Sequence, residues 1–208
     1  MGCKKDNKDE PTSVIRGSIK FDNKALGVRS NGVQLELWQY GYQLFSKIPV
    51  YLNQDGTFSA SVFNGNYKLT LLRGNGPWAD KTDSIDVKVS GTADVDVTVD
   101  PYFIIKNEKY EKSGSTITAT LNLQRVNTSK ALELVRVYIG QTLLTDQNIN
   151  IANAQKAAAA IPDINQPVTV TVTVPASFTK EYAFMRVGVK AVGVAELLYS
   201  QPQMISLK

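Results

Sequence analysis

Trp78 has the clearest potential for binding chemistry in this sequence. It lies in the segment Arg73–Lys81, whose two glycines and one proline predict a loop. An exposed indole accepts the apolar C–H face of a sugar ring, and Asn75, Asp80 and Lys81 would hydrogen-bond the hydroxyls at its edge. The segment is therefore predicted to bind carbohydrate. The alternative is that Trp78 folds back and closes the end of a domain, because a large aromatic side chain usually finds cover.

A second aromatic group occupies Trp38–Phe45. Trp38 and Tyr40 are two residues apart, so they would share one face of a strand. If that face is exposed, the two rings extend the predicted carbohydrate site beside Trp78. The alternative is burial in the core, which accounts for most aromatic stripes of this kind.

Four aspartates recur at short spacing near the middle of the chain: Asp86, Asp94, Asp96 and Asp100. Paired carboxylates can bind Ca²⁺ or act as acid and base in glycoside hydrolysis. Their spacing is more typical of the solvated faces of two adjacent strands, and the glycine turns of a calcium loop are absent. The sequence has no histidine and no nucleophile-elbow, phosphate-loop or serine-triad pattern. We therefore expect a non-catalytic protein that uses no metal or cofactor.

The formal net charge of +4 is spread along the 208 residues as single lysines and arginines. Nucleic-acid-binding surfaces gather basic side chains on one element with aromatic side chains between them, so nucleic acid is not an expected partner. No apolar run approaches the ~20 residues that a membrane-spanning helix needs.

Cys3 is the only cysteine, which excludes an intrachain disulfide. It follows Gly2 and precedes the charged tract Lys4–Glu10, so residues 1–13 are expected to form a flexible tether. This arrangement resembles bacterial lipoproteins, and the tract resembles that of surface-exported lipoproteins of Bacteroidetes. The resemblance implies that a lipid on Cys3 anchors the protein in the outer membrane at the cell surface. It also implies that the apolar signal segment before Cys3 is missing from this sequence and that Met1 is an artificial start. The alternative is that Cys3 is an incidental free thiol.

Residues 14–101 alternate apolar and polar side chains in short segments, which is typical of half-buried strands. About seven such segments recur at 8–12-residue spacing without a helical period, so this part of the chain is expected to form a β-sandwich. Phe58–Val62 and Tyr67–Leu71 flank Asn64-Gly65, a combination that predicts a hairpin.

Residues 102–208 show the same alternation, most clearly in Ile117–Leu123 and Val168–Val174. Ile151–Ile161 is ambiguous, since its alanines favour helix but its flanks limit a helix to two turns. We expect a second β-sandwich. It resembles an immunoglobulin-like or fibronectin type III domain, in which Tyr182 would form the tyrosine corner if a bulge follows it. The fold class is therefore all-β, with two tandem sandwiches.

The first domain resembles the carboxypeptidase regulatory-like, or transthyretin-like, sandwich through an Asp-Gly-x-Phe turn at Asp55–Phe58 and a Gly-x-Tyr at Gly65–Tyr67. With Gly76-Pro77-Trp78 and the exit Asp100-Pro101-Tyr102, the whole resembles the DUF3823 family of Bacteroidetes lipoproteins. Such proteins are often encoded beside SusC/SusD-type glycan-uptake systems.

The family resemblance implies a glycan-binding or scaffolding accessory of such a complex. Its expected partners are a polysaccharide or oligosaccharide and SusC/SusD-like outer-membrane proteins. The alternative function is a structural or adhesive module that docks other proteins and binds no sugar.

Overall fold

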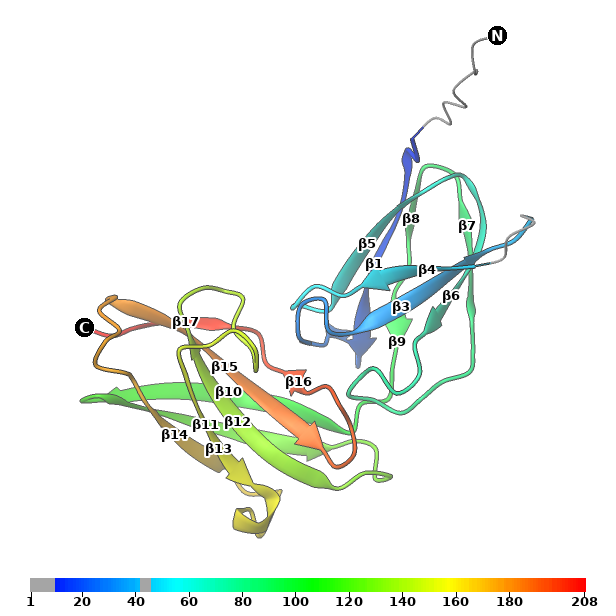
Figure 1. The fold of residues 1–208 in the computed structure, drawn as a ribbon. Coiled ribbons are helices and arrows are strands. Elements are labelled where there is room, and N and C mark those ends of the chain that lie inside the picture. The colour runs from blue at the N-terminus through cyan, green and yellow to red at the C-terminus, as the bar shows by residue number, and fades with distance from the viewer. Residues whose placement is uncertain (1–9, 42–45) are drawn as a thin grey trace.

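The computed structural model describes residues 10–41 and 46–208, which form two β-sandwich domains (Figure 1). The tether proposed for residues 1–13 therefore lies largely outside the described residues, and β1 begins at its end. The strands of the first domain are β1 (Ser13–Phe21), β2 (Lys24–Ala25), β3 (Gln34–Gln39), β4 (Lys47–Tyr51), β5 (Thr57–Val62), β6 (Gly65–Leu71), β7 (Ile85–Val89), β8 (Thr92–Asp94) and β9 (Val97–Thr98).

Two sheets face each other in the first domain. One has the order β2-β1-β5, with β8 and β9 also paired to β1, and the other has the order β4-β3-β6-β7. The alternation seen in the sequence decides which side chains meet between them. Leu35 and Leu37 of β3 point inward with Tyr67 and Leu69 of β6, and all four are buried.

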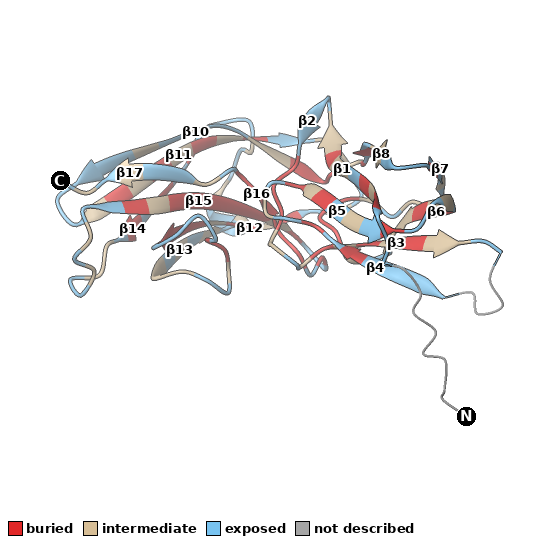
Figure 2. Ribbon diagram, turned by 90° about the horizontal axis from the view of Figure 1, so that it is seen from above, coloured by how far each residue is buried: buried red, intermediate tan, exposed pale blue. Residues whose placement is uncertain are grey.

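The second domain contains β10 (Phe103–Ser113), β11 (Thr116–Arg125), β12 (Leu132–Gly140), β13 (Ala152–Ala157), β14 (Val168–Thr173), β15 (Tyr182–Ala191), β16 (Leu198–Tyr199) and β17 (Gln203–Ser206). Its sheets are β10-β11-β14 and β13-β12-β15-β16, with β17 also paired to β15. Figure 2 shows buried residues, in red, along β11, β12, β14 and β15. The predicted all-β fold with two β-sandwiches is confirmed.

The predicted hairpin between Phe58–Val62 and Tyr67–Leu71 is wrong. β5 pairs with β1, whereas β6 pairs with β3 and β7, so the Asn64-Gly65 turn carries the chain from one sheet to the other. The Asn64 side chain fixes this corner, because its Oδ1 accepts hydrogen bonds from Ser13 Oγ (2.7 Å) and Gly91 N (3.0 Å). An Asn-Gly turn sets the tightness of a bend but not the partner of the next strand.

The ambiguous alanine segment is mainly a strand. Ala152–Ala157 forms β13 against β12, and only Ala158–Ala160 forms a single turn of 3₁₀ helix. Pairing with a neighbouring strand therefore overrides the helix propensity of alanine here.

The tyrosine-corner resemblance of Tyr182 is also wrong. Its side chain is 41% exposed, and β15 pairs with β12 and β17 without a bulge next to it. Ala183, Met185 and Val187 form the core face of β15, so Tyr182 and Phe184 belong to the outer face.

Candidate functional site

The Trp78 loop is part of the first domain's core. The Trp78 side chain is 3% exposed and belongs to the main cluster of buried apolar residues. Its backbone forms a bridge with Pro101, and its indole covers Gly76 so closely that a Cβ atom there would lie 2.2 Å from the ring. The prediction that Trp78 presents its ring to a sugar is therefore wrong in this structure.

The polar neighbours of Trp78 stabilise the loop itself. Asn75 Oδ1 accepts a hydrogen bond from Gln34 N (2.6 Å), and its Nδ2 donates to Gly32 O (3.2 Å). Asp80 Oδ1 accepts a hydrogen bond from Gly74 N (2.7 Å), while Lys81 Nζ donates to Thr98 O (2.9 Å). These hydrogen bonds account for the polar residues without a ligand, so the alternative interpretation of a closed domain end fits the geometry.

The other predicted aromatic pair faces outward. Trp38 lies on the side of β3 opposite the buried Leu35 and Leu37, and it is half-buried. Its Nε1 donates a hydrogen bond to Thr70 Oγ1 (3.3 Å) on the neighbouring strand β6. Tyr40, just beyond the end of β3, is 54% exposed.

Strand β4 adds a third ring to this face. Tyr51 is 49% exposed and pairs with Gln34, four residues before Trp38, so it lies ~13 Å along the strand from Trp38. Most of β4 is exposed, as its pale-blue colour in Figure 2 shows. We call Trp38, Tyr40 and Tyr51 with the side chains between them the aromatic face. Sequence reasoning missed Tyr51, although its alternation with the buried Val50 and Leu52 indicated an outward position.

Ion pairs flank the rings of the aromatic face. Lys47 Nζ lies 2.6 Å from Glu36 Oε1, and Lys68 Nζ lies 2.6 Å from Asp86 Oδ1. The hydrogen bond to Asp86 raises the pKa of Lys68, and Tyr40 adds a smaller electrostatic effect in the same direction. Aromatic rings beside polar groups can stack on a sugar and hydrogen-bond its hydroxyls.

The four aspartates do not form one site. Asp86 belongs to β7 in one sheet, whereas Asp94 and Asp96 lie in or beside β8 and β9, which pair with β1 in the other. Asp94 pairs with Arg16 (2.6 Å) and Asp96 with Lys20 (2.6 Å), while Asp100 accepts a hydrogen bond from Asn127. The prediction that they line two adjacent strands is wrong, since the chain changes sheets between β7 and β8.

The domain junction holds a buried arginine that sequence reasoning did not single out. Arg186 points from the outer face of β15 toward the first domain and is 0% exposed. Its guanidinium donates to the carbonyl oxygens of Ser200 (2.9 Å), Thr145 (3.1 Å), Val28 (2.9 Å) and Gln54 (2.8 Å), the last two in the first domain. Burial lowers the pKa of Arg186 to about 10, so the guanidinium remains charged at neutral pH.

Further contacts fix the same junction. Arg29 of the first domain pairs with the carboxylate of Glu196 through two hydrogen bonds. Tyr199 N donates to Gly27 O (2.9 Å), and the Arg186 guanidinium lies 4.5 Å from the Tyr199 ring centroid. Hydrogen bonds from charged groups and a backbone bridge hold the domains in one orientation.

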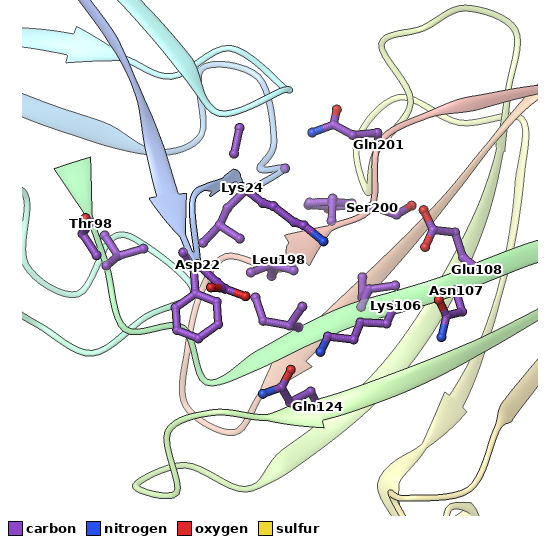
Figure 3. Close-up of a pocket in the computed structure, with 18 residues that line it drawn as sticks. Asp22, Lys24, Thr98, Lys106, Asn107, Glu108, Gln124, Leu198, Ser200 and Gln201 are labelled. Atoms are coloured by element: carbon purple, nitrogen blue, oxygen red, sulfur yellow. The ribbon is translucent and has the colours of Figure 1, made fainter. Parts of the chain in front are cut away.

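A groove opens beside this junction, between β2 and β9 of the first domain and β10 and β16 of the second (Figure 3). It has a volume of about 790 Å³. No sequence pattern indicates this groove, because its walls come from parts of the chain that meet only in the folded protein.

Comparison with known proteins identifies the family. A family model described as the N-terminal domain of a protein of unknown function, DUF3823, matches residues 13–100, and its C-terminal companion domain matches residues 103–204. No curated protein is significantly similar to this chain. Within the ranges described by the structure, no helix is long and apolar enough to span a membrane.

Solved structures of similar proteins share the whole fold. A DUF3823 protein from Bacteroides ovatus ATCC 8483 is 35% identical with a TM-score of 0.87, over 94% of this chain and 100% of that one. One from Parabacteroides merdae ATCC 43184 is 30% identical with a TM-score of 0.87, over 95% and 100%. A protein from Bacteroides uniformis ATCC 8492, for which carbohydrate binding has been suggested, is 22% identical with a TM-score of 0.76, over 95% and 100%. The chain described here belongs to the DUF3823 family.

Proposed function

We propose that this protein is a non-catalytic surface lipoprotein that binds polysaccharide on the aromatic face of its first domain. The observation that carries the proposal is that Trp38, Tyr40 and Tyr51 lie on one solvent-facing side of β3 and β4, beside two ion pairs. A flat face with spaced rings suits an extended polysaccharide better than a small molecule, which prefers an enclosed pocket. The carbohydrate binding suggested for the Bacteroides uniformis relative is in keeping with this role.

The proposed cellular role is that of an accessory to a SusC/SusD-like uptake complex, anchored in the outer membrane at the cell surface through a lipid on Cys3. Cys3 lies outside the described residues, so the anchor rests on the sequence resemblance. A cysteine carrying several acyl chains would hold the protein firmly without any membrane-binding surface on the sandwiches.

Lipidation has a direct test. When the gene is expressed in a Bacteroidetes host, the wild-type protein is expected to incorporate labelled palmitate and to be digested by protease added to intact cells. Cys3→Ser is expected to lose the label, because it removes the acceptor thiol. A wild-type protein without label would contradict the anchor, and a labelled protein that resists protease would contradict surface exposure.

Binding at the aromatic face is tested by truncating its rings. The double variant Trp38→Ala/Tyr40→Ala is expected to bind the polysaccharide at least about tenfold more weakly in affinity electrophoresis, since two stacking contacts are lost. Tyr40→Ala/Tyr51→Ala removes the two rings that are more exposed than Trp38. It is expected to weaken polysaccharide binding similarly, with less effect on folding. Tyr182→Ala, an exposed ring on the second domain, is the matched control and is expected to bind normally.

Two results would count against this assignment. Unchanged binding in both double variants would exclude the aromatic face, and failure of the wild type to bind any polysaccharide would exclude the glycan role.

A structural or adhesive module is the second candidate function. Leu143, Leu144 and Met204 of the second domain are exposed, together with Tyr182. Apolar side chains that gather in one exposed patch favour contact with another protein, and Leu143 and Leu144 are neighbours in the chain. This function would be preferred if no glycan binds and the protein copurifies with an outer-membrane partner.

A further inference from the structure

The groove beside the domain junction has an apolar floor and a polar rim. Leu26, Ile104, Ile105 and Leu198 supply apolar surface from both domains. The rim consists of side chains that hydrogen-bond or carry charge: Asp22, Lys24, Thr98, Lys106, Asn107, Glu108, Gln124 and Gln201 (Figure 3). An apolar surface with a few directed polar groups is the usual composition of a ligand site.

A β-bulge shapes one wall. The pairing of β10 with β11 shifts register between Lys106 and Lys109, and Asn107 within the bulge has a φ of +54°. In a regular strand, neighbouring side chains point to opposite faces, yet Lys106, Asn107 and Glu108 all line the groove. Bulges that redirect side chains in this way are common beside functional sites.

A tight turn shapes the opposite wall. Asp22 and Asn23 both have positive φ, at +50° and +59°, and this turn places Asp22 and Lys24 at the groove. Lys24 and Lys106 extend their ammonium ends from the two walls toward the middle of the groove (Figure 3). One cation thus comes from each domain.

Most polar side chains of the rim lack a hydrogen-bond or ion-pair partner within the described residues. Within residues 10–41 and 46–208, the side chains of Asp22, Lys24 and Lys106 make no hydrogen bond or ion pair, and neither do those of Asn107, Gln124 and Gln201. The nearby Lys20, by contrast, pairs with Asp96. Because the Arg186 contacts hold the two domains together, the groove needs no rearrangement of the domains to present these groups to a ligand.

We propose that this groove binds an acidic sugar residue, one that carries a carboxylate on a polyhydroxylated ring. Lys24 and Lys106 would hold the carboxylate between them, and the amides of Asn107, Gln124 and Gln201 would pair with hydroxyls. The apolar floor would accept the C–H face of the ring.

The charges of the groove favour a carboxylate over a phosphate. Asp22 and Glu108 lie in the same groove as the two lysines, so a dianion would meet about twice the repulsion that a monoanion meets. The two carboxylates are also good acceptors for sugar hydroxyls. The inference rests on the proposed function for its class of ligand, but it uses a different surface from the aromatic face.

The test is isothermal titration calorimetry of the whole protein with galacturonic acid, a monoanion, and with neutral galactose. The acidic sugar is expected to bind, and the neutral one at least tenfold more weakly. Lys24→Met/Lys106→Met is expected to weaken binding of galacturonic acid by tenfold or more, because two charged hydrogen bonds are lost. Lys88→Met/Lys109→Met, which removes the same charge from exposed positions outside the groove, is expected to leave it unchanged.

A milder variant guards against effects on folding. Asn107→Gly suits the positive φ and removes only the amide, so it is expected to weaken binding severalfold without loss of stability. Unchanged binding in Lys24→Met/Lys106→Met would overturn the inference, as would equal binding of inorganic phosphate or of an oligoglutamate peptide. Polysaccharide binding that depends on Trp38 and Tyr40 would survive such a failure, so the two proposals fail separately.

Discussion

Trp78→Ala is expected to lower the free energy of unfolding by about 3–5 kcal/mol, the cost of emptying a large buried aromatic site. The ring is almost fully buried and covers Gly76, while the backbone on either side of it hydrogen-bonds with the linker at Asp100 and Tyr102. Because the loop cannot collapse without disturbing that linker, the cavity should be filled only in part.

Urea denaturation followed by circular dichroism measures this change. Trp38→Ala, which truncates the same residue type at a half-buried position, is the matched control and should cost less. If Trp78→Ala kept wild-type stability but selectively lost polysaccharide binding, the ring would be available to ligands in solution, and the site first predicted at this loop would be restored.

Arg186→Met is expected to destabilise the protein by about 3 kcal/mol or more, since four carbonyl oxygens at the junction lose a charged donor. Methionine preserves much of the apolar length, so the loss reports the hydrogen bonds and not a large void. Arg186→Lys should restore only part of the lost stability, because an ammonium group cannot reach all four carbonyl oxygens that the planar guanidinium contacts.

Hydrogen exchange of wild type and variant locates the effect. Faster exchange is expected at the residues that meet across the junction, including Val28 and Tyr199, while β11 in the second domain stays protected. Arg29→Met removes the Arg29–Glu196 pair, which is less buried than Arg186, and is expected to have a smaller effect. An Arg186→Met protein as stable as the wild type would mean that water satisfies the four carbonyls and that the arginine does not fix the domains.

The strands could be predicted from the sequence because alternation is a local property. Leu35 and Leu37 indicated a buried face of β3. The same period puts Trp38 on the opposite side, but whether that side is exposed or buried could not be predicted from the sequence. The sheet to which each strand belongs could not be predicted in this way. The segments on either side of Asn64-Gly65 would show the same alternation whether they pair with each other or with distant strands. Long-range pairing was therefore the main source of error in the fold.

The residues of the domain junction and of the groove beside it were missed for a related reason. One of the four hydrogen-bond partners of Arg186, Val28, lies 158 residues away, and a Met-Arg-Val segment gives no sign that its arginine is buried. Strand β10 mixes lysines and glutamates without clear alternation, so neither it nor the bulge at Asn107 could be recognised. For Trp78, the glycines and proline indicated a loop correctly, but a loop that folds inward has the same composition as one that projects.

The fixed junction has a mechanical consequence for a protein held at its N-terminus. β1 begins at the end of the first domain that lies away from the second domain (Figure 1). Because Arg186 fixes the angle between the sandwiches, the two domains would reorient together as one rigid body. The second domain and its exposed apolar residues would then keep a set distance from the start of β1, and a partner bound there would be held at that distance.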